Sequence, residues 1–388
     1  MQSVVSSVTM TDENTTFIPG LQLCEAFYHQ VVEPIVSRHF GELKFSAALI
    51  GSGSEVLGFD TEMSSDHHWG PRVMMFLKPE DVSTYKDSIS EKLSRELPRV
   101  FRGYPTSFSS PDSENKGVQL LDYSQSGPIN HRVEISSIER FVDDYLGFDI
   151  TTELEACDWL SFPGQKLRTI LGGKIFRDDI GLVDTRSRFS YYPEDVWLYL
   201  LACAWSRIEQ EEHLMGRSGF VGDEVGAGII AARLVRDMMN LCFLMEKVYA
   251  PYPKWFGTAF KGLQCASFLE PLLLKVMSSS SWEERQSHLV PAYEFLAAMH
   301  NQLEITEKLP TRARDFHGRP FMVISMGDYS KAICSRIAQL KTASTAIKEL
   351  AKKPLIGSVE QFSDSTDLLS NSCWRAVIRN FYNVEGSV

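Results

Sequence analysis

Residues 45–68 read FSAALIGSGSEVLGFDTEMSSDHH, and this stretch decides the predicted fold. Its first six residues are apolar or small and predict a buried strand that runs into a Gly/Ser turn. The chain then returns through Asp66-His67-His68 to a second apolar run at 72–77. This layout places a glycine-rich turn, whose backbone can approach phosphate, beside an acid that can bind a metal ion.

The composition is that of an ordinary globular protein. At 388 residues the chain has room for two domains, and 44% of its residues are hydrophobic. A net charge of −11 argues against a nucleic-acid partner, which usually requires a basic face. No apolar run reaches the ~18 residues of a membrane span, and the N-terminus lacks the apolar stretch of a signal peptide, so no membrane association is expected. The seven cysteines show no C-x-x-C spacing, so we expect reduced thiols and a cytoplasmic protein; the oligomeric state stays open.

The chain up to residue 190 has the pattern of a small mixed α/β domain. Residues 1–19 are polar and are expected to be disordered, and residues 20–190 form the domain itself. Helical spacing is seen at 24–36, where Pro34 should bend the helix, and at 82–97. A hairpin is predicted at 173–189. The remaining strand-like runs are 45–50, 72–77, 118–123 and 130–136.

A helical domain, residues 191–388, is predicted to follow. The sequence Tyr192-Pro193-Glu194-Asp195 has the proline and the acids that are typical of the first turn of a helix. Long helical patterns then cover 194–213, 223–249, 258–277, 282–304 and 328–351. The predicted fold class is therefore α+β, with a small mixed β-sheet domain followed by an all-helical domain.

Glu134 belongs to a predicted strand whose two faces differ. Alternation places Arg132 and Glu134 on one face and apolar residues on the other. On an extended chain Asp66 and His68 would also point the same way, so these two and Glu134 would surround one point. The alternatives are an exposed glutamate on an edge strand, an aspartate that caps a turn, and a surface histidine pair.

Together these motifs resemble those of the nucleotidyltransferase superfamily of aminoglycoside-modifying and polymerase-β-like enzymes. The resemblance consists of Ile50-Gly51-Ser52, a thirteen-residue gap, Asp66-x-His68 and a later apolar-Glu134-apolar strand. The longer stretches 51–60 and 65–72 resemble one branch of it, an uncharacterised domain-of-unknown-function family found in bacteria and fungi. The resemblance covers nearly the whole chain, because it continues at Tyr192–Trp197, Asn301, Arg319–Phe321 and Gly357–Phe362.

The resemblance implies an enzyme that transfers a nucleoside monophosphate from a nucleoside triphosphate, such as ATP, to a small-molecule acceptor. Asp66 and Glu134 would bind Mg²⁺, which would activate the acceptor and neutralise the leaving pyrophosphate. Backbone N–H groups of the turn would lie near the phosphates. The nucleotide contacts would come from Gly51, Ser52, Ser54 and Ser65.

The helical domain would add further contacts to phosphate and acceptor. The candidates are Arg217, Asp223, Arg236 and Lys254, with Arg233 as a further basic residue. The alternative for the cations is a solvated helix face, and for Asp223 it is a helix cap. Elsewhere, His300-Asn301 is expected to satisfy core polar groups. The exposed end of a helix is predicted at Glu209, Glu211, Glu212 and His213, with an acceptor-side base among them as the alternative.

His68 departs from the pattern, since most relatives carry an acid at this position. Neutral imidazole offers one lone pair and no charge, and Mg²⁺ prefers oxygen ligands, so the site should bind divalent cations more weakly. Asp60-x-Glu62 is a second acid pair, but it lies too close to Ser52 and is treated as part of a loop.

Three interpretations remain open. The protein transfers a nucleotide with one Mg²⁺, or with Mn²⁺, which accepts nitrogen ligands more readily. Alternatively, it is a repurposed, metal-independent enzyme of small-molecule, secondary metabolism that uses His68 as a general acid or base. The third interpretation is a non-catalytic binding module.

Overall fold

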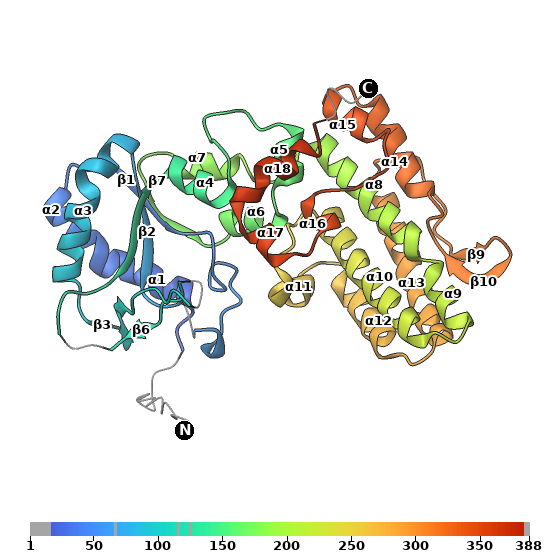
Figure 1. The fold of residues 1–388 in the computed structure, drawn as a ribbon, viewed down its shortest axis with the longest axis horizontal. Coiled ribbons are helices and arrows are strands. Elements are labelled where there is room, and N and C mark those ends of the chain that lie inside the picture. The colour runs from blue at the N-terminus through green and yellow to red at the C-terminus, as the bar shows by residue number, and fades with distance from the viewer. Residues whose placement is uncertain (1–16, 66–67, 115–116, 124–125, 384–388) are drawn as a thin grey trace. The chain divides into compact units, whose positions relative to one another are not determined.

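A computed structural model describes residues 17–65, 68–114, 117–123 and 126–383 (Figure 1). The chain folds into two compact units. Unit 1 contains the described residues up to Phe141 together with Gly172–Thr185, and unit 2 contains Val142–Leu171 together with the chain from Arg186 onward. Residues 142–171, which the sequence places before the predicted boundary at 190, thus group with the helical part.

Most of the segment predicted to be disordered, residues 1–19, lies outside the described residues. Its last residues are packed in the structure, because the ring of Phe17 stacks on Trp69 at 5.6 Å and Ile18 contacts the core of unit 1.

The sheet of unit 1 has four strands in the order β7-β2-β1-β8. β2 and β7 are parallel, and β1 pairs antiparallel with both β2 and β8, so the predicted mixed sheet is confirmed. The strands are β1 (Phe45–Leu49), β2 (Arg72–Leu77), β7 (Arg132–Ser137) and β8 (Lys174–Asp178).

The predicted hairpin at 173–189 is wrong. β8 pairs with β1 instead, and the chain then forms helix α7 (Leu182–Ser187). The carboxylate of Asp178 accepts hydrogen bonds from the backbone N–H groups of Gly181, Leu182 and Val183. This side chain therefore satisfies the first N–H groups of the helix, which favours a helix start over a hairpin turn.

One face of the sheet forms the core of unit 1. Val133 and Ile135 of β7 are buried with Val73 and Met75 of β2, while Glu134 between them is exposed, as the alternation predicts. This face packs against helices α1 (Gly20–Phe27), α2 (Glu33–Phe40) and α3 (Pro79–Glu96). The opposite face carries Arg72, Arg132 and Glu134 near the start of β2 and β7.

The first helix is interrupted near Pro34, as predicted. A π-helical turn, Tyr28–Val32, separates α1 from α2, and Pro34 lies in the first turn of α2. Proline lacks an N–H donor and its ring clashes with the carbonyl one turn earlier, so a widened turn relieves that clash. The predicted strand at 118–123 shortens to β6 (Leu121–Asp122). The other short strands of unit 1 are β3 (Val100–Phe101), β4 (Tyr104–Pro105) and β5 (Ser107–Phe108).

Unit 2 is built mainly from helices, so the predicted α+β class is confirmed. A two-stranded hairpin, β9 (Arg314–Phe316) with β10 (Arg319–Val323), is an addition to the predicted all-helical domain. Helix α4 (Ile138–Leu146) crosses from unit 1 into unit 2 along the chain. The helices before α11 are α5 (Ala156–Ser161), α6 (Gly164–Leu171), α8 (Glu194–Glu211), α9 (Leu214–Phe220) and α10 (Glu224–Met245). The later helices are α11 (Pro253–Phe260), α12 (Ala266–Ser278), α13 (Trp282–Gln302), α14 (Asp328–Gln339), α15 (Thr345–Leu350), α16 (Val359–Phe362), α17 (Thr366–Ser370) and α18 (Arg375–Asn380).

Two helical patterns that appear continuous in the sequence are divided in the structure. The pattern at 258–277 is split between α11 and α12, and the pattern at 328–351 is split between α14 and α15. Ser344 begins α15 by accepting a hydrogen bond from the N–H of Ile347 at 3.3 Å, which is the role of a helix cap. Among the described residues, no helix has the length and apolarity that crossing a membrane requires.

The core of unit 2 surrounds α8, which packs against α10 and α14. The indole of Trp205 stacks on the ring of Tyr329 at 4.1 Å, and His300 lies edge-on to Tyr329 at 4.9 Å. His300 is fully buried and Nε2 contacts the hydroxyl of Thr306 at 3.1 Å, so the predicted core role is confirmed.

Glu212 contradicts the predicted exposed end of α8. Its carboxylate is buried and accepts hydrogen bonds from the backbone N–H groups of Ile324, Ser325 and Met326. Burial raises the pKa of Glu212, and the three N–H donors oppose that rise. This acid is therefore a structural anchor for the chain that follows β10.

Candidate functional site

Three strands of unit 1 bring their ends to the same end of the sheet. β1 ends at Leu49, where the Gly/Ser turn begins, and the antiparallel β2 begins there with Arg72. β7 runs parallel to β2, and its first residue, Arg132, pairs with Arg72. Polar side chains from these elements and from the intervening loop gather at this end. We call them the sheet-end cluster: Ser52, Glu55, His68, Arg72, Arg132 and Glu134.

A buried ion pair supports the Gly/Ser turn. Arg72 donates to Oε1 of Glu55 from Nε at 2.9 Å and from Nη2 at 2.6 Å, and Nη2 also donates to the carbonyl of Ser52 at 2.7 Å. The two charged side chains are only 9% and 4% exposed. Burial alone would lower the pKa of Arg72, but Glu55, together with smaller contributions from Cys24 and Glu134, outweighs that cost and the pKa is raised. The pair therefore ties the turn to the start of β2.

Gly53 is required by this ion pair. Its φ is +142°, and a Cβ at this position would lie 2.5 Å from Nη2 of Arg72 and 2.6 Å from Oε2 of Glu55. Gly51 also has a positive φ, +78°. Both glycines therefore adopt backbone conformations that other residues rarely take.

The predicted nucleotide-contact serines have different environments. Ser52 is exposed and Ser54 is buried, with the carbonyl of Ser54 accepting hydrogen bonds from the N–H groups of Leu57 and Phe59. Ser65 follows a 3₁₀ turn, Glu62–Ser64, and its hydroxyl donates to the carbonyl of Glu62 at 2.6 Å. Ser52 is thus the serine of this group whose position leaves it open to a ligand.

Asp60 has a structural role, which supports its treatment as a loop residue. Its Oδ2 accepts a hydrogen bond from Nε1 of Trp69 at 3.0 Å and another from the N–H of Gly20 at 2.6 Å. The carboxylate therefore anchors the loop to the start of α1.

His68 adopts a left-handed backbone conformation, with a φ of +53°. The extended backbone expected from Asp66 to His68 is therefore wrong at His68. Its N–H donates to the carbonyl of Gln119 at 3.0 Å, which fixes the residue against the loop before β6. Asp66 itself lies outside the described residues. Histidine is among the side chains that visit this region several times more often than most, and such positions are frequent at functional sites.

Arg132 lies between His68 and Glu134. Nη1 of Arg132 is 2.9 Å from Nδ1 of His68, and Nη2 donates to Oε1 of Glu134 at 2.8 Å. The guanidinium also lies over the ring of Phe108, with 5.7 Å from Cζ to the ring centroid. The side chain of Arg132 is 13% exposed, whereas that of Glu134 is 51% exposed. The structure thus brings His68 and Glu134 together through an arginine.

The described residues of this cluster do not fit a divalent-cation site. A guanidinium can only donate hydrogen bonds, so Nδ1 of His68 accepts one, and the single lone pair of the neutral ring is used. One oxygen of Glu134 already has a cationic partner. Coulomb repulsion would oppose a divalent ion about 5 Å from the guanidinium by roughly 7 kcal/mol at an effective dielectric constant of about 20.

Two of the candidates in unit 2 have structural partners. The carboxylate of Asp223 accepts a hydrogen bond from the N–H of Gly226 at 2.8 Å, so the predicted cap of α10 is confirmed. Arg236 pairs with Asp364 at 3.0 Å, and both side chains are exposed. Neither contact excludes a ligand, but each gives the residue a role within unit 2.

The other two candidates are exposed cations. Nζ of Lys254 lies 5.0 Å from the ring centroid of Trp255, and Arg217 is exposed on α9. Arg233, the further basic residue, forms an ion pair with Glu211. In the structure, Lys254 and Arg217 therefore lie on solvent-exposed helix faces, as the alternative interpretation expects.

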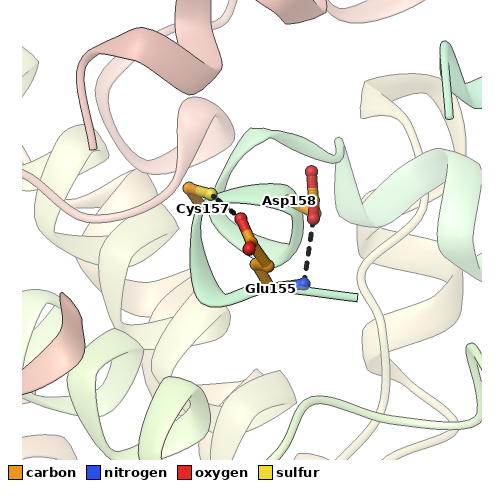
Figure 2. Close-up of side chains that lie close together, drawn as sticks. All are labelled: Glu155, Cys157 and Asp158. Atoms are coloured by element: carbon orange, nitrogen blue, oxygen red, sulfur yellow. Dashed lines mark hydrogen bonds between the residues drawn. The ribbon is translucent and has the colours of Figure 1, made fainter. Parts of the chain in front are cut away.

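A second group of possible metal ligands lies at the start of α5 in unit 2: Glu155, Cys157 and Asp158 (Figure 2). Figure 2 shows the Cys157 thiol directed at the Glu155 carboxylate, which it contacts at 3.5 Å. Burial raises the pKa of Cys157 to about 11, so the thiol keeps its proton at neutral pH. Arg375 and Arg379 both donate to Asp158, and Arg379 also pairs with Glu155. The acids therefore already have cationic partners, and the group serves to hold α18 against α5.

Arg132, Arg72 and Glu55 belong to the site although the sequence motifs give them no role in it. One signal was available, because alternation puts Arg132 on the same face as Glu134, two residues away. The pairing of Arg72 with Glu55 had no signal of comparable strength, since it depends on the path of the loop between them.

Comparisons with known proteins give a family match and several structural neighbours. Residues 159–256, about a quarter of the chain, match a family described as a domain of unknown function (DUF4037). The crystal structure of a nucleotidyltransferase-like protein from Exiguobacterium sibiricum is similar over 81% of this chain and 87% of its own, with 11% identity and a TM-score of 0.31. No curated protein matches the chain. The family match is of the domain-of-unknown-function kind that the sequence resemblance predicts. A TM-score of 0.31 is too low to establish a shared fold, so the site rests on the geometry of this chain.

Proposed function

We propose that this protein transfers a nucleoside monophosphate from a nucleoside triphosphate to a small-molecule acceptor. The observation that carries the proposal is the gathering of the Gly/Ser turn, His68, Arg132 and Glu134 at one end of the sheet. A glycine turn with open backbone and a guanidinium are both groups that bind phosphate. A half-exposed carboxylate beside them is available to an acceptor.

In the proposed reaction, the oxygen of an acceptor hydroxyl attacks the α-phosphorus of the triphosphate. A new P–O bond forms, the bond from the α-phosphorus to the α,β-bridging oxygen breaks, and pyrophosphate leaves with that electron pair. The hydroxyl proton passes to a carboxylate, and Glu134 is the acid of the sheet-end cluster that solvent reaches. Asp66 is retained as a second proposed acid.

The cationic part of the cluster is proposed to hold the phosphates. Phosphate charge increases on the leaving pyrophosphate, and a fixed cation stabilises that charge. Arg132 supplies such a cation at the sheet end, with Ser52 exposed on the turn. In unit 2, the exposed cations Arg217 and Lys254 remain proposed contacts, as do Arg236 and Asp223.

A second candidate function follows from the state of the His68 ring. Because Nδ1 accepts a hydrogen bond from Arg132, the proton of the neutral ring is on Nε2. His68 would then act as a hydrogen-bond donor or general acid in metal-independent chemistry on a small molecule. This candidate shares the site with the first and differs from it in needing no nucleotide.

Nucleotide binding tests the proposal directly. Thermal unfolding is measured with each of the four ribonucleoside triphosphates, in Mg²⁺, in Mn²⁺ and in chelator. A ligand at about 100 times its Kd stabilises the native state by roughly 2.7 kcal/mol, which gives a clear rise in Tm. We expect at least one triphosphate to raise the Tm and to release pyrophosphate when a metabolite extract is added. If no triphosphate binds under any condition, the proposal is wrong and the second candidate gains.

A further inference from the structure

The charges of the sheet-end cluster are not distributed evenly. Arg72 is buried and committed to Glu55 and to the carbonyl of Ser52, so its charge is compensated inside the protein. Arg132 has a partner acid too, but Glu134 is 51% exposed. Solvent therefore screens the Arg132–Glu134 pair more than the Arg72–Glu55 pair, and an arriving anion can compete for Arg132.

The guanidinium of Arg132 has donors left for a ligand. Within the described part of the chain it makes three hydrogen bonds: Nη1 to Nδ1 of His68 at 2.9 Å, Nη1 to the carbonyl of His68 at 3.4 Å, and Nη2 to Glu134 at 2.8 Å. A guanidinium carries five N–H groups, so the Nε group and one proton of Nη2 remain. These two donors are left for an anionic oxygen ligand, and guanidinium N–H groups bind phosphate oxygens through strong charge-assisted hydrogen bonds.

His68 and Phe108 hold that guanidinium in place. Nδ1 of His68 fixes one end of it, and its plane is supported by the ring of Phe108 at 5.7 Å. His68 holds this contact while its backbone is in the left-handed region, with a φ of +53°. A neutral imidazole is suited to this task, because a carboxylate would neutralise the cation as well as orient it.

We propose that the guanidinium of Arg132 takes the place of a divalent cation at this site and binds the phosphates of the nucleotide, so that nucleotide binding needs no metal ion. This inference rests on the proposed function, since it specifies how the same site holds its triphosphate. His68 is then a positioning residue for Arg132 rather than a metal ligand.

Calorimetric titration with α,β-methylene-ATP, which cannot lose pyrophosphate by cleavage at the α,β position, tests this inference. Inorganic triphosphate serves as a second probe that reports the phosphate contacts alone. Each probe is titrated in EDTA and in Mg²⁺ into the unaltered protein, Arg132→Ala and Arg95→Ala. Arg95 is a matched control, because it is 70% exposed on α3 and forms a surface ion pair with Glu91.

We expect the unaltered protein to bind α,β-methylene-ATP in EDTA with a Kd within threefold of the value in Mg²⁺. Arg132→Ala should weaken binding of both probes at least tenfold, and Arg95→Ala should leave it unchanged. Circular dichroism verifies that Arg132→Ala is folded. If it is not, Arg132→Gln, which keeps more of the side chain and a polar end, is used instead.

Two outcomes would overturn the inference and leave the proposed function standing. One is binding that EDTA abolishes and Mg²⁺ restores. The other is binding that Arg132→Ala and Arg132→Gln do not weaken. Absence of binding of either probe under all conditions contradicts the proposed function itself, and the inference falls with it.

Discussion

Nη1 of Arg132 lies 2.9 Å from Nδ1 of His68, in the part of the fold where the sequence predicts a metal ion. An arginine cannot accept a hydrogen bond, so this contact fixes the tautomer of His68 and uses its lone pair. The histidine at position 68, where most relatives carry an acid, and the arginine at position 132 therefore act together. The histidine keeps the guanidinium in place without cancelling its charge.

An acid at position 68 should create a divalent-cation site only if Arg132 is also removed. His68→Asp alone should stay unable to bind Mn²⁺, because the new carboxylate pairs with Arg132. The double variant His68→Asp/Arg132→Ala should bind Mn²⁺ at least tenfold more tightly than either single variant. Aspartate tolerates the left-handed backbone at this position, so the variants are expected to fold. Mn²⁺ titration followed by electron paramagnetic resonance measures the affinity, and equal affinity in all variants would refute the coupling.

Glu55→Gln should destabilise the protein severely, because it leaves the buried guanidinium of Arg72 without a counter-charge. Removing one partner of a buried ion pair typically costs about 3–5 kcal/mol. Urea unfolding followed by circular dichroism gives the loss in free energy. Glu91→Gln is the control, since Glu91 pairs with Arg95 at the surface, where such pairs contribute about 1 kcal/mol or less. Similar losses in the two variants would show that the Arg72 pair is not buried as described.

Gly53→Ala should cost more stability than Gly58→Ala. Both glycines have a positive φ, but a Cβ at Gly53 would meet Arg72 and Glu55 within 3 Å, whereas nothing lies within 4 Å at Gly58. Alanine at Gly58, whose φ is +72°, should cost about 1–2 kcal/mol in backbone strain, and at Gly53 the clash with the ion pair and the more extreme φ of +142° add to that cost. The difference in free energy of unfolding between the variants measures this added cost. A difference near zero would mean that the turn does not enclose the pair.

Acid should weaken the fold through His300. Burial lowers the pKa of His300 to about 4, while the unfolded chain has the ordinary value of 6.5. Above pH 6.5 the ring is neutral in both states and adds no pH dependence. As the pH falls from 6.5 to 4, the unfolded state binds the proton first, so stability decreases by up to roughly 3 kcal/mol.

Comparison with His300→Gln isolates this contribution. Glu360 acts in the opposite direction, because burial raises its pKa to about 7 and the folded state binds its proton more readily as the pH falls from 7 to 4.5. The free energy of unfolding is therefore measured against pH for the unaltered protein and for His300→Gln. The difference between the two curves should change steadily between pH 6.5 and 4, and a constant difference would mean that the pKa of His300 is the same in the folded and unfolded states.

The sequence predicts the fold of unit 1 well where periodicity is strong. β1, β2 and β7 lie where the apolar runs place them, and the two faces of β7 differ as its alternation requires. The hairpin at 173–189 fails because one side chain, Asp178, caps a helix there. Such a contact depends on how the chain folds around Asp178, and local sequence patterns do not predict that path.

The site is predicted less completely than the fold. The pattern locates the turn, His68 and Glu134, because spacing along strands decides which side chains share a face. The pattern does not predict that Arg132 lies between His68 and Glu134. Acids and imidazoles can bind either a metal ion or an arginine, so their presence alone does not show which of the two is there. The sequence pattern does not predict the buried pair of Arg72 and Glu55 for a different reason. An ion pair between residues far apart in the sequence produces no periodic pattern.

A crystal structure of the protein with α,β-methylene-ATP, grown in chelator, tests the central claim most directly. We expect phosphate oxygens to lie within hydrogen-bonding distance of the Arg132 guanidinium and beside the Gly51–Ser54 turn, with Nδ1 of His68 still in contact with Arg132. A nucleotide bound elsewhere, or a site that assembles only with a divalent ion on Glu134 and with Arg132 turned away, would contradict it.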